Sequence, residues 1–367
     1  MIPLVDLKAQ HAQVADDVQK GWAEVLANTS FVLGKHVAEF EKAYAAFQNV
    51  AHCVGLANGT DAVELAVRAL GIGPGDEVIV PANTFIATAL GVARAGATPV
   101  LVDSDPVYHL LDAEKIAAKI TPRTKAVYAV HLYGQIANIE AIEQVIAGKG
   151  ITLLEDAAQC QGAKRHGKLA GQFGAVAATS FFPGKNLGAY GDGGAILTES
   201  EAVAKKAIAL RNYGSEVKYH HPETGFNSRL DTLQAVVLSA KLKHLPRWNE
   251  ERRAAAARYR ELLAPLAGTI TLPETLPGNE HVWHLYVVRV PRRDETLKKL
   301  NAAGVGAGIH YPVPIHLQGA FKHLGHAAGD FPVAEKAAQE ILSLPIFPGI
   351  TAEQQATVAA ELGKAIG

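Results

Sequence analysis

One lysine lies in a segment that is otherwise rich in glycine and aromatic residues, "SFFPGKNLGAYGDGG", from Ser180 to Gly194. Lys185 follows the apolar run "AVAATSFF", which is typical of a buried strand. A charged amine next to such a strand is costly unless it is paired or neutralised. Burial readily lowers the pKa of a lysine, and a neutral amine is a good nucleophile toward carbonyl carbon. Lys185 is therefore a candidate for forming an imine.

Two other segments could complete a site for an anionic cofactor. Asp156 ends an apolar run in "LLEDAAQCQGA", where it either caps a following helix or holds a protonated ring nitrogen. Gly59 and Thr60 begin a helical pattern in "GLANGTDAVELAVRAL", whose first backbone amides form either a simple cap or an anion site. Enzymes that use pyridoxal 5'-phosphate (PLP) need a lysine, an acid partner for the pyridinium nitrogen and a phosphate site. These residues could supply all three.

The elements that must position these residues alternate along the chain. Short apolar runs predict strands at 76–81, 98–105, 125–134, 151–159, 174–183 and 193–200, and helical patterns occupy 59–71, 84–96, 112–120 and 138–150. This order predicts an α/β fold with a mostly parallel sheet covered on both faces, and ligands bind at the carboxyl ends of such strands. The glycines of "GIGPGDEV" follow a helix and precede a strand, which is the wrong order for a dinucleotide-binding loop.

The C-terminal third has a different pattern. A long charged helix is expected in "PRWNEERRAAAARYRELLAPL", and shorter strand and helix patterns follow it. We therefore predict a large PLP-binding domain over residues 1–245 and a small α+β domain over residues 246–367.

Composition limits the classes of function. The chain has 367 residues, of which 49% are hydrophobic and 19% charged, and its formal net charge is −1. These values fit a soluble globular protein and indicate no nucleic-acid or membrane partner. Two cysteines, Cys53 and Cys160, and no His-Glu-x-x-His motif give no basis for a disulfide framework or a metal site. With no signal-peptide pattern and no long apolar run, we expect a cytoplasmic protein.

Long motifs in fixed order resemble the DegT/DnrJ/EryC1/StrS family of sugar aminotransferases, which are PLP enzymes of fold type I. They include "FVLGKHVAEFEKAYAAF", "GTDAVELAVRALGIGPGDEVIVPANTFIATA", "SFFPGKNLGAYGDGGA" and "ILSLPIFPGIT", and together they span nearly the whole chain. The resemblance implies the fold of aspartate aminotransferase, with a large sheet domain and a small C-terminal domain. PLP sugar dehydratases of this family carry histidine in place of the imine-forming lysine, so Lys185 argues against that activity.

The resemblance also implies roles for individual residues. Lys185 matches the lysine that forms the imine and moves the proton, and Asp156 matches the partner of the pyridinium nitrogen. The other expected cofactor contacts are Gln159 near the phenolic oxygen, Phe85 stacked on the ring, and Gly59, Thr60 and Ser180 at the phosphate. Asn227 matches a residue that reaches the phosphate of a neighbouring subunit, which implies a homodimer with shared active sites. Phe182 stands where many relatives have tyrosine, so a hydroxyl contact made there by relatives is absent.

The implied reaction transfers an amino group, usually from L-glutamate, to a keto group of a nucleotide-linked sugar. The C-terminal segments look most like the branch that acts on dTDP-linked 3-keto-6-deoxyhexoses. Candidate substrate contacts are His310, Tyr311, Lys218 and Arg229. His310 is equally well explained as a structural histidine, and Arg229 as an ion-pair partner at a dimer interface. A 4-keto-6-deoxy sugar aminotransferase and a non-catalytic binding or regulatory protein are the alternatives, and the sugar configuration at C4, the nucleotide and the end product stay open.

Overall fold

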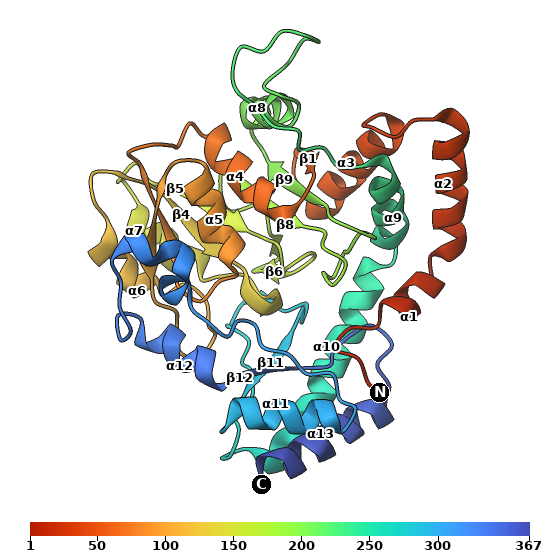
Figure 1. Ribbon diagram of the computed structural model, residues 1–367, viewed down its shortest axis with the longest axis vertical. Coiled ribbons are helices and arrows are strands. Elements are labelled where there is room, and N and C mark those ends of the chain that lie inside the picture. Colours follow the sequence, from red (N-terminus) through yellow and green to blue (C-terminus); the bar gives the residue numbers. More distant parts are fainter.

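A seven-stranded sheet forms the centre of the computed structural model, which describes residues 1–367 (Figure 1). Its strands are β1 (His52–Leu56), β2 (Glu77–Pro81), β3 (Thr98–Val102), β4 (Thr124–Val130), β5 (Thr152–Asp156), β8 (Val176–Ser180) and β9 (Gly194–Thr198). They lie in the order β1-β9-β8-β5-β4-β2-β3. β9 runs antiparallel to both of its neighbours, β1 and β8, and every other adjacent pair of strands is parallel. The predicted mostly parallel sheet is confirmed.

Helices cover both faces of this sheet. Alternate strand residues face two separate apolar cores: Val127 of β4 packs in one, and Tyr128 packs in the other. The first core is closed by α3 (Lys35–Gln48), α6 (Ala113–Ile116), α7 (Ile139–Ile146) and α9 (Thr232–Leu242), and the second by α4 (Gly59–Ala69), α5 (Ile86–Arg94) and α8 (Glu201–Arg211). Outside α9 lie α1 (Leu7–Ala12) and α2 (Ala15–Asn28) (Figure 1).

The helix predicted over 112–120 is shorter than expected. It forms α6, which ends at Ile116, and continues only as a 3₁₀ turn, η1 (Ala117–Lys119). Ala113 and Ile116 are buried, whereas η1 buries none of its residues. The apolar face that would hold a longer helix against the sheet therefore stops after one turn.

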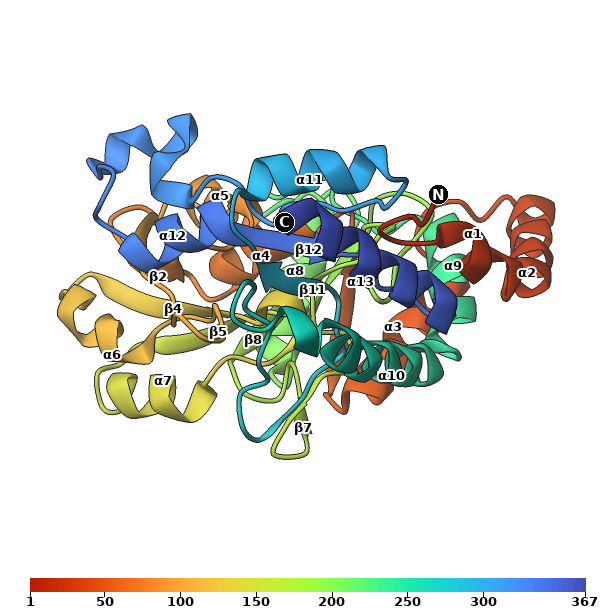
Figure 2. The same cartoon turned by 90° about the horizontal axis from the view of Figure 1, so that it is seen from below.

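A third core belongs to the C-terminal part of the chain. It lies between a two-stranded antiparallel sheet and the long helices at the lower end of the molecule (Figures 1 and 2). These elements are α10 (Leu245–Leu263), β11 (Tyr286–Arg289), α11 (Arg293–Ala302), β12 (Ile341–Leu344) and α13 (Ala352–Ile366). The N-terminus joins this region, because Ile2 pairs with Val305 in a parallel bridge.

Two segments of the C-terminal third return to the large sheet. Ile315, Phe321 and Phe331 pack in the core beneath α4 and α5, beside α12 (Pro332–Glu340). A three-stranded sheet joins β10 (Asn279–Glu280) to β6 (Lys164–Arg165) and β7 (Lys168–Leu169). The segment that includes His310 is held at the strand ends of the large sheet, because the hydroxyl of Tyr133 donates to the carbonyl oxygen of His310 at 2.5 Å and the amide of Ile315 donates to the carbonyl oxygen of Ala82 at 2.9 Å. None of the helices has the length and apolarity that a membrane span requires.

Candidate active site

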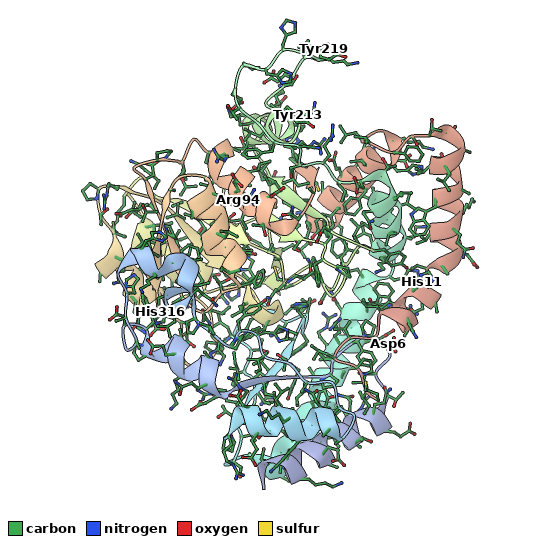
Figure 3. All side chains as sticks on the ribbon, viewed as in Figure 1. Asp6, His11, Arg94, Tyr213, Tyr219 and His316 are labelled. Carbon is green, nitrogen blue, oxygen red and sulfur yellow. The ribbon has the colours of Figure 1, made fainter.

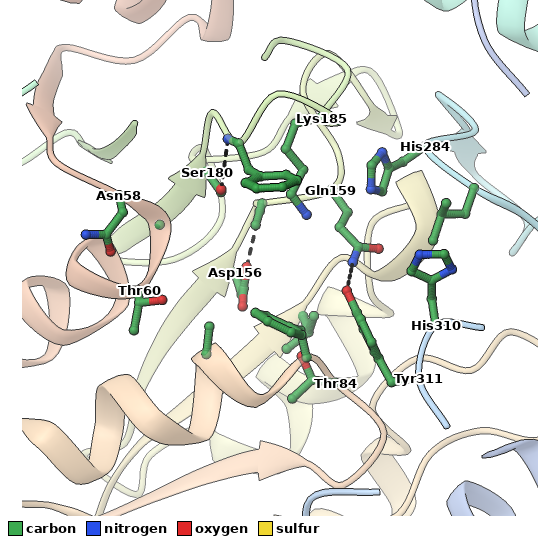
Figure 4. Close-up of a pocket in the computed structure, with 18 of the residues that line it drawn as sticks. Asn58, Thr60, Thr84, Asp156, Gln159, Ser180, Lys185, His284, His310 and Tyr311 are labelled. Carbon is green, nitrogen blue, oxygen red and sulfur yellow. Dashed lines mark hydrogen bonds between the residues drawn. The ribbon is translucent and has the colours of Figure 1, made fainter. Parts of the chain in front are cut away.

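A cavity of about 640 Å³ lies where the large sheet meets the C-terminal region (Figure 4). Its volume suits a cofactor together with a substrate. Nine of the predicted site residues line it: Gly59, Thr60, Phe85, Asp156, Gln159, Ser180, Lys185, His310 and Tyr311. They come from the segments at the carboxyl ends of four strands, β1, β2, β5 and β8, and from one distant C-terminal segment, so the fold brings together residues that are far apart in the sequence.

The N-terminus of α4 forms one end of the cavity. The side chain of Asn58 caps the helix by accepting a hydrogen bond from the amide of Asp61 at 2.8 Å, so the preceding amides of Gly59 and Thr60 are not capped by it. A Cβ atom on Gly59 would lie 2.5 Å from Cβ of Ser180, so only glycine permits this approach of helix and strand. The free amides of Gly59 and Thr60, together with the hydroxyl groups of Thr60 and Ser180, form a site for a phosphate-sized anion.

Asp156 ends β5 at the floor of the cavity and is 7% exposed. Its Oδ2 accepts a hydrogen bond from the hydroxyl of Thr88 at 2.6 Å, and its Oδ1 accepts one from the amide of Ala158 at 3.1 Å. The hydroxyls of Thr84 and Thr88 are 2.9 Å apart, and Thr84 lines the cavity. The hydrogen bond between Thr88 and Asp156 is thereby connected to the cavity wall. A buried carboxylate held in this way can accept a hydrogen bond from a protonated ring nitrogen.

Lys185 lies in the loop after β8, close to Asp156 and Gln159 (Figure 4). Burial lowers the pKa of its amine from 10.5 to about 8, although the charge of Asp156 acts in the opposite direction. The loop is tightly folded: a Cβ atom on Gly188 would lie 2.3 Å from the carbonyl oxygen of Pro183. A lysine that loses its proton near pH 8 can attack a carbonyl carbon.

Gln159 connects the backbone behind the cavity to an aromatic residue of the cavity lining. Its Oε1 accepts a hydrogen bond from the amide of Tyr133 at 2.7 Å, and its Nε2 donates to the hydroxyl of Tyr311 at 3.1 Å. Burial raises the pKa of Tyr311, so its phenol stays neutral. The ring of Phe85 lies 5.1 Å from that of Tyr311 and is tilted by 39°, so the two rings flank the same part of the cavity.

The wall opposite the anion end has residues that sequence reasoning missed. Besides His310, it includes His284, and the cavity is also lined by Leu4 and Val5 of the N-terminal segment (Figure 4). His310 shares a hydrogen bond with the hydroxyl of Ser343 at 2.8 Å, and burial lowers its pKa to about 4. Burial also lowers the pKa of His284 well below its usual value, so both histidines are neutral at physiological pH.

Three predicted residues lie away from the cavity of their own chain. Lys218 is on the exposed loop that projects beyond α8, where its amine lies 5.0 Å from the ring centre of Tyr219 (Figures 1 and 3). Arg229 lies 5.7 Å from the ring centre of Tyr213, and Asn227 is exposed. A single chain does not bring these side chains to the site, and their roles stay predictions.

Known proteins place this geometry in a family. The chain matches the model of the DegT/DnrJ/EryC1/StrS aminotransferase family over residues 13–363. It is 46% identical to the "Pleiotropic regulatory protein" of Geobacillus stearothermophilus, over 99% of this chain and 98% of that one. It is 45% identical to the dTDP-3-amino-3,4,6-trideoxy-alpha-D-glucose transaminase of Streptomyces venezuelae, over 96% and 93%.

A relative named for a UDP-linked sugar and a solved structure are similar to the chain to the same degree. The UDP-N-acetyl-3-dehydro-alpha-D-glucosamine 3-aminotransferase of Acidithiobacillus ferrooxidans is 46% identical, over 98% of this chain and 96% of that one. The crystal structure of S. venezuelae DesV in complex with a ketimine intermediate superposes with a TM-score of 0.96 at 44% identity, covering 99% and 98% of the two chains. The chain therefore belongs to the DegT/DnrJ/EryC1/StrS aminotransferase family and is a PLP-dependent nucleotide-sugar aminotransferase.

Proposed function

We propose that this aminotransferase transfers an amino group from L-glutamate to C3 of a dTDP-linked 3-keto-6-deoxyhexose. The observation that carries aminotransfer is the meeting of Lys185, Asp156 and the α4 anion site in one cavity. The choice of C3 is supported by the names of the S. venezuelae and A. ferrooxidans relatives, which both refer to position 3. The dTDP-linked sugar follows the first of them and the C-terminal segments described above.

Each cofactor-binding residue has a defined task in this proposal. PLP, when bound, withdraws electrons from the carbon that exchanges its proton. Asp156 keeps the proton on the ring nitrogen, and Lys185 forms the covalent link and moves the proton through Nζ. Thr60, Ser180 and the α4 amides hold the phosphate. Phe85 would stack on the ring, and Gln159 would lie near its phenolic oxygen.

We also propose that the active enzyme is a homodimer whose subunits complete each other's sites. Lys185 is the only lysine or arginine that lines the cavity, whereas the two carboxylates of glutamate and the sugar diphosphate all call for cations. Lys218 and Arg229 lie outside the cavity, where a partner's site could use them. Val217 and Tyr219 on the projecting loop are 63% and 81% exposed, which is typical of a surface that another chain covers.

Separate half-reactions test the proposed substrate. The protein is loaded with the aminated cofactor, and dTDP-linked 3-keto-6-deoxy and 4-keto-6-deoxy sugars are added in turn while the visible absorbance of the lysine-bound cofactor is followed. We expect that band to return with the 3-keto sugar alone. Its return with the 4-keto sugar alone would keep the aminotransferase and overturn the choice of C3.

A further inference from the structure

His284 lines the cavity close to Lys185 and Gln159, is 8% exposed, and has no role in the proposal above (Figure 4). It lies two residues before β11, and hydrogen bonds from Arg252 of α10 fix the backbone next to it. The buried guanidinium of Arg252 donates to the carbonyl oxygens of Trp283 at 3.1 Å and Ile346 at 3.0 Å. The imidazole therefore sits on a rigid support.

The hydrogen bonds of Asn186 determine which ring nitrogen of His284 carries the proton. The amide nitrogen of Asn186 donates to Oδ1 of Asn249 at 3.0 Å and to the carbonyl oxygen of Val282 at 3.0 Å. Its Oδ1 is then left as an acceptor, 3.2 Å from Nδ1 of His284. Nδ1 must therefore donate, and the unprotonated nitrogen is Nε2.

Nε2 of His284 makes no hydrogen bond within the protein. Burial lowers the pKa of this ring well below its usual value, and the nearby charges of Lys185 and Arg252 lower it further. The ring is therefore a neutral acceptor on the cavity wall. Such a lone pair suits a hydroxyl donor and disfavours a carboxylate. The amine of glutamate reacts at the cofactor and leaves only carboxylates to reach this wall, so the acceptor favours the sugar.

We propose that Nε2 of His284 accepts a hydrogen bond from a hydroxyl of the hexose next to the keto carbon. This inference rests on the proposed sugar half-reaction, and it makes His284 a residue that selects the sugar without serving the amino donor. The position of the ring agrees with this task, because His284 and His310 lie across the cavity from Asn58 and Thr60 at the anion end (Figure 4).

Two substitutions separate the proposed contact from the structural one. In His284→Asn, the shorter amide can keep the hydrogen bond to Asn186 but lacks an acceptor at the position of Nε2. In His284→Gln, the longer amide places an oxygen near that position. Both variants are measured in two half-reactions, with L-glutamate and with whichever nucleotide-linked keto sugar the wild type converts fastest, so the result does not depend on C3.

We expect His284→Asn to lower the efficiency of the sugar half-reaction about tenfold, as for the loss of one neutral hydrogen bond, mainly through a weaker apparent affinity for the sugar. His284→Gln should recover most of this loss, and the glutamate half-reaction should change less than about twofold in either variant. The cofactor absorbance and the melting temperature show whether each variant is folded. An equal loss in both half-reactions would overturn the proposal and assign His284 to Lys185 instead.

Deoxy sugars identify the hydroxyl. The wild type and His284→Asn are compared on the parent keto sugar and on analogues that lack a hydroxyl next to the keto carbon, which is the one at C2 or C4 of a 3-keto sugar and the one at C3 of a 4-keto sugar. For the analogue without the contacting hydroxyl, the two proteins should have the same efficiency. If His284→Asn slows every analogue as much as the parent sugar, the proposed hydroxyl contact is wrong, whether or not the sugar is a 3-keto sugar.

Discussion

The two ends of the cavity are built in different ways. The cofactor end uses Thr60, Asp156, Ser180 and Lys185, which all lie at or just after strand ends of one sheet. The opposite wall includes His284 and His310 from the C-terminal third. The cofactor end is thus formed by residues that directly follow strands of one sheet. The opposite wall forms only when segments far apart in the sequence pack together.

We infer from this difference that residues at the cofactor end serve the chemical steps and residues on the opposite wall select the substrate. Side chains at the sheet end contact the cofactor in the proposed mechanism, so changing them should affect both half-reactions. Side chains on the opposite wall contact only what enters afterwards, so changing them should affect one half-reaction. The predictions below are ways to test this division.

Lys185→Ala should have the largest effect. Without the amine there is no covalent link to the cofactor and no group at that position to move the proton. We expect no visible band of lysine-bound cofactor and no turnover with any amino donor. Measured turnover above background in the folded variant would remove Lys185 from the chemistry, and retained phosphate-dependent cofactor binding serves as the control for folding.

Asp156→Asn should come next. The amide cannot stabilise a protonated ring nitrogen as a carboxylate does, so the cofactor becomes a weaker electron acceptor. We expect the cofactor to bind and both half-reactions to slow roughly a thousandfold, which is within the range for loss of a positioned acid–base group. Single-turnover absorbance changes measure these rates, and rates near those of the wild type would contradict the role of Asp156.

The sheet end could be predicted because each of its residues follows an apolar strand, and parallel strands end at the same edge. Gly59, Asp156 and Lys185 needed no knowledge of distant packing for this reason. Their exact partners did need it, since Thr88 reaches Asp156 only through the register of α5 on the sheet.

The opposite wall was harder to predict because its signals are not local. "HVWHLYVVRV" has two histidines before a strand, and the network through Asn186 and Asn249 decides what His284 can do. Leu4 reaches the cavity because the N-terminal segment pairs with Val305, about three hundred residues later. His310 was found through family resemblance, and its residue type alone left a structural role equally plausible.

The pH dependence of cofactor recombination tests the environment of Lys185. Because burial lowers its pKa to about 8, the amine is half neutral at that pH, approaches full deprotonation about one unit above it, and its neutral fraction falls about tenfold per unit well below it. We expect the rate at which PLP recombines with the apoenzyme to rise from pH 7 and level off near pH 9. Stopped-flow absorbance measures this rate in a range where the phosphate is mostly doubly ionised. A rate that still rises through pH 10 would show a solvent-exposed amine.

Asn227→Ala tests whether the cofactor end is complete within one chain. If Asn227 reaches the phosphate in a partner's site, removing its amide should weaken cofactor retention about tenfold, as for a lost hydrogen bond to a charged group. Dialysis followed by cofactor absorbance measures retention, and sedimentation gives the oligomeric state at each concentration. Full retention by a clean monomer would rule out the shared site and would make the sheet end self-sufficient.

Thr88→Val should have the smallest effect, and its pattern sharpens the comparison between the two ends. Thr88 does not line the cavity, yet its hydroxyl donates to Oδ2 of Asp156, while the amide of Ala158 still holds Oδ1. We expect both half-reactions to slow about fivefold together, with unchanged apparent affinities for glutamate and the sugar, because the change loosens Asp156 and the neighbouring hydroxyl of Thr84 at the cofactor end. Thr88→Ser keeps the hydroxyl and should restore the rates, whereas Thr88→Val removes it at nearly constant volume. A loss confined to the sugar half-reaction would place Thr88 with the substrate wall and would show that the two ends are not independent.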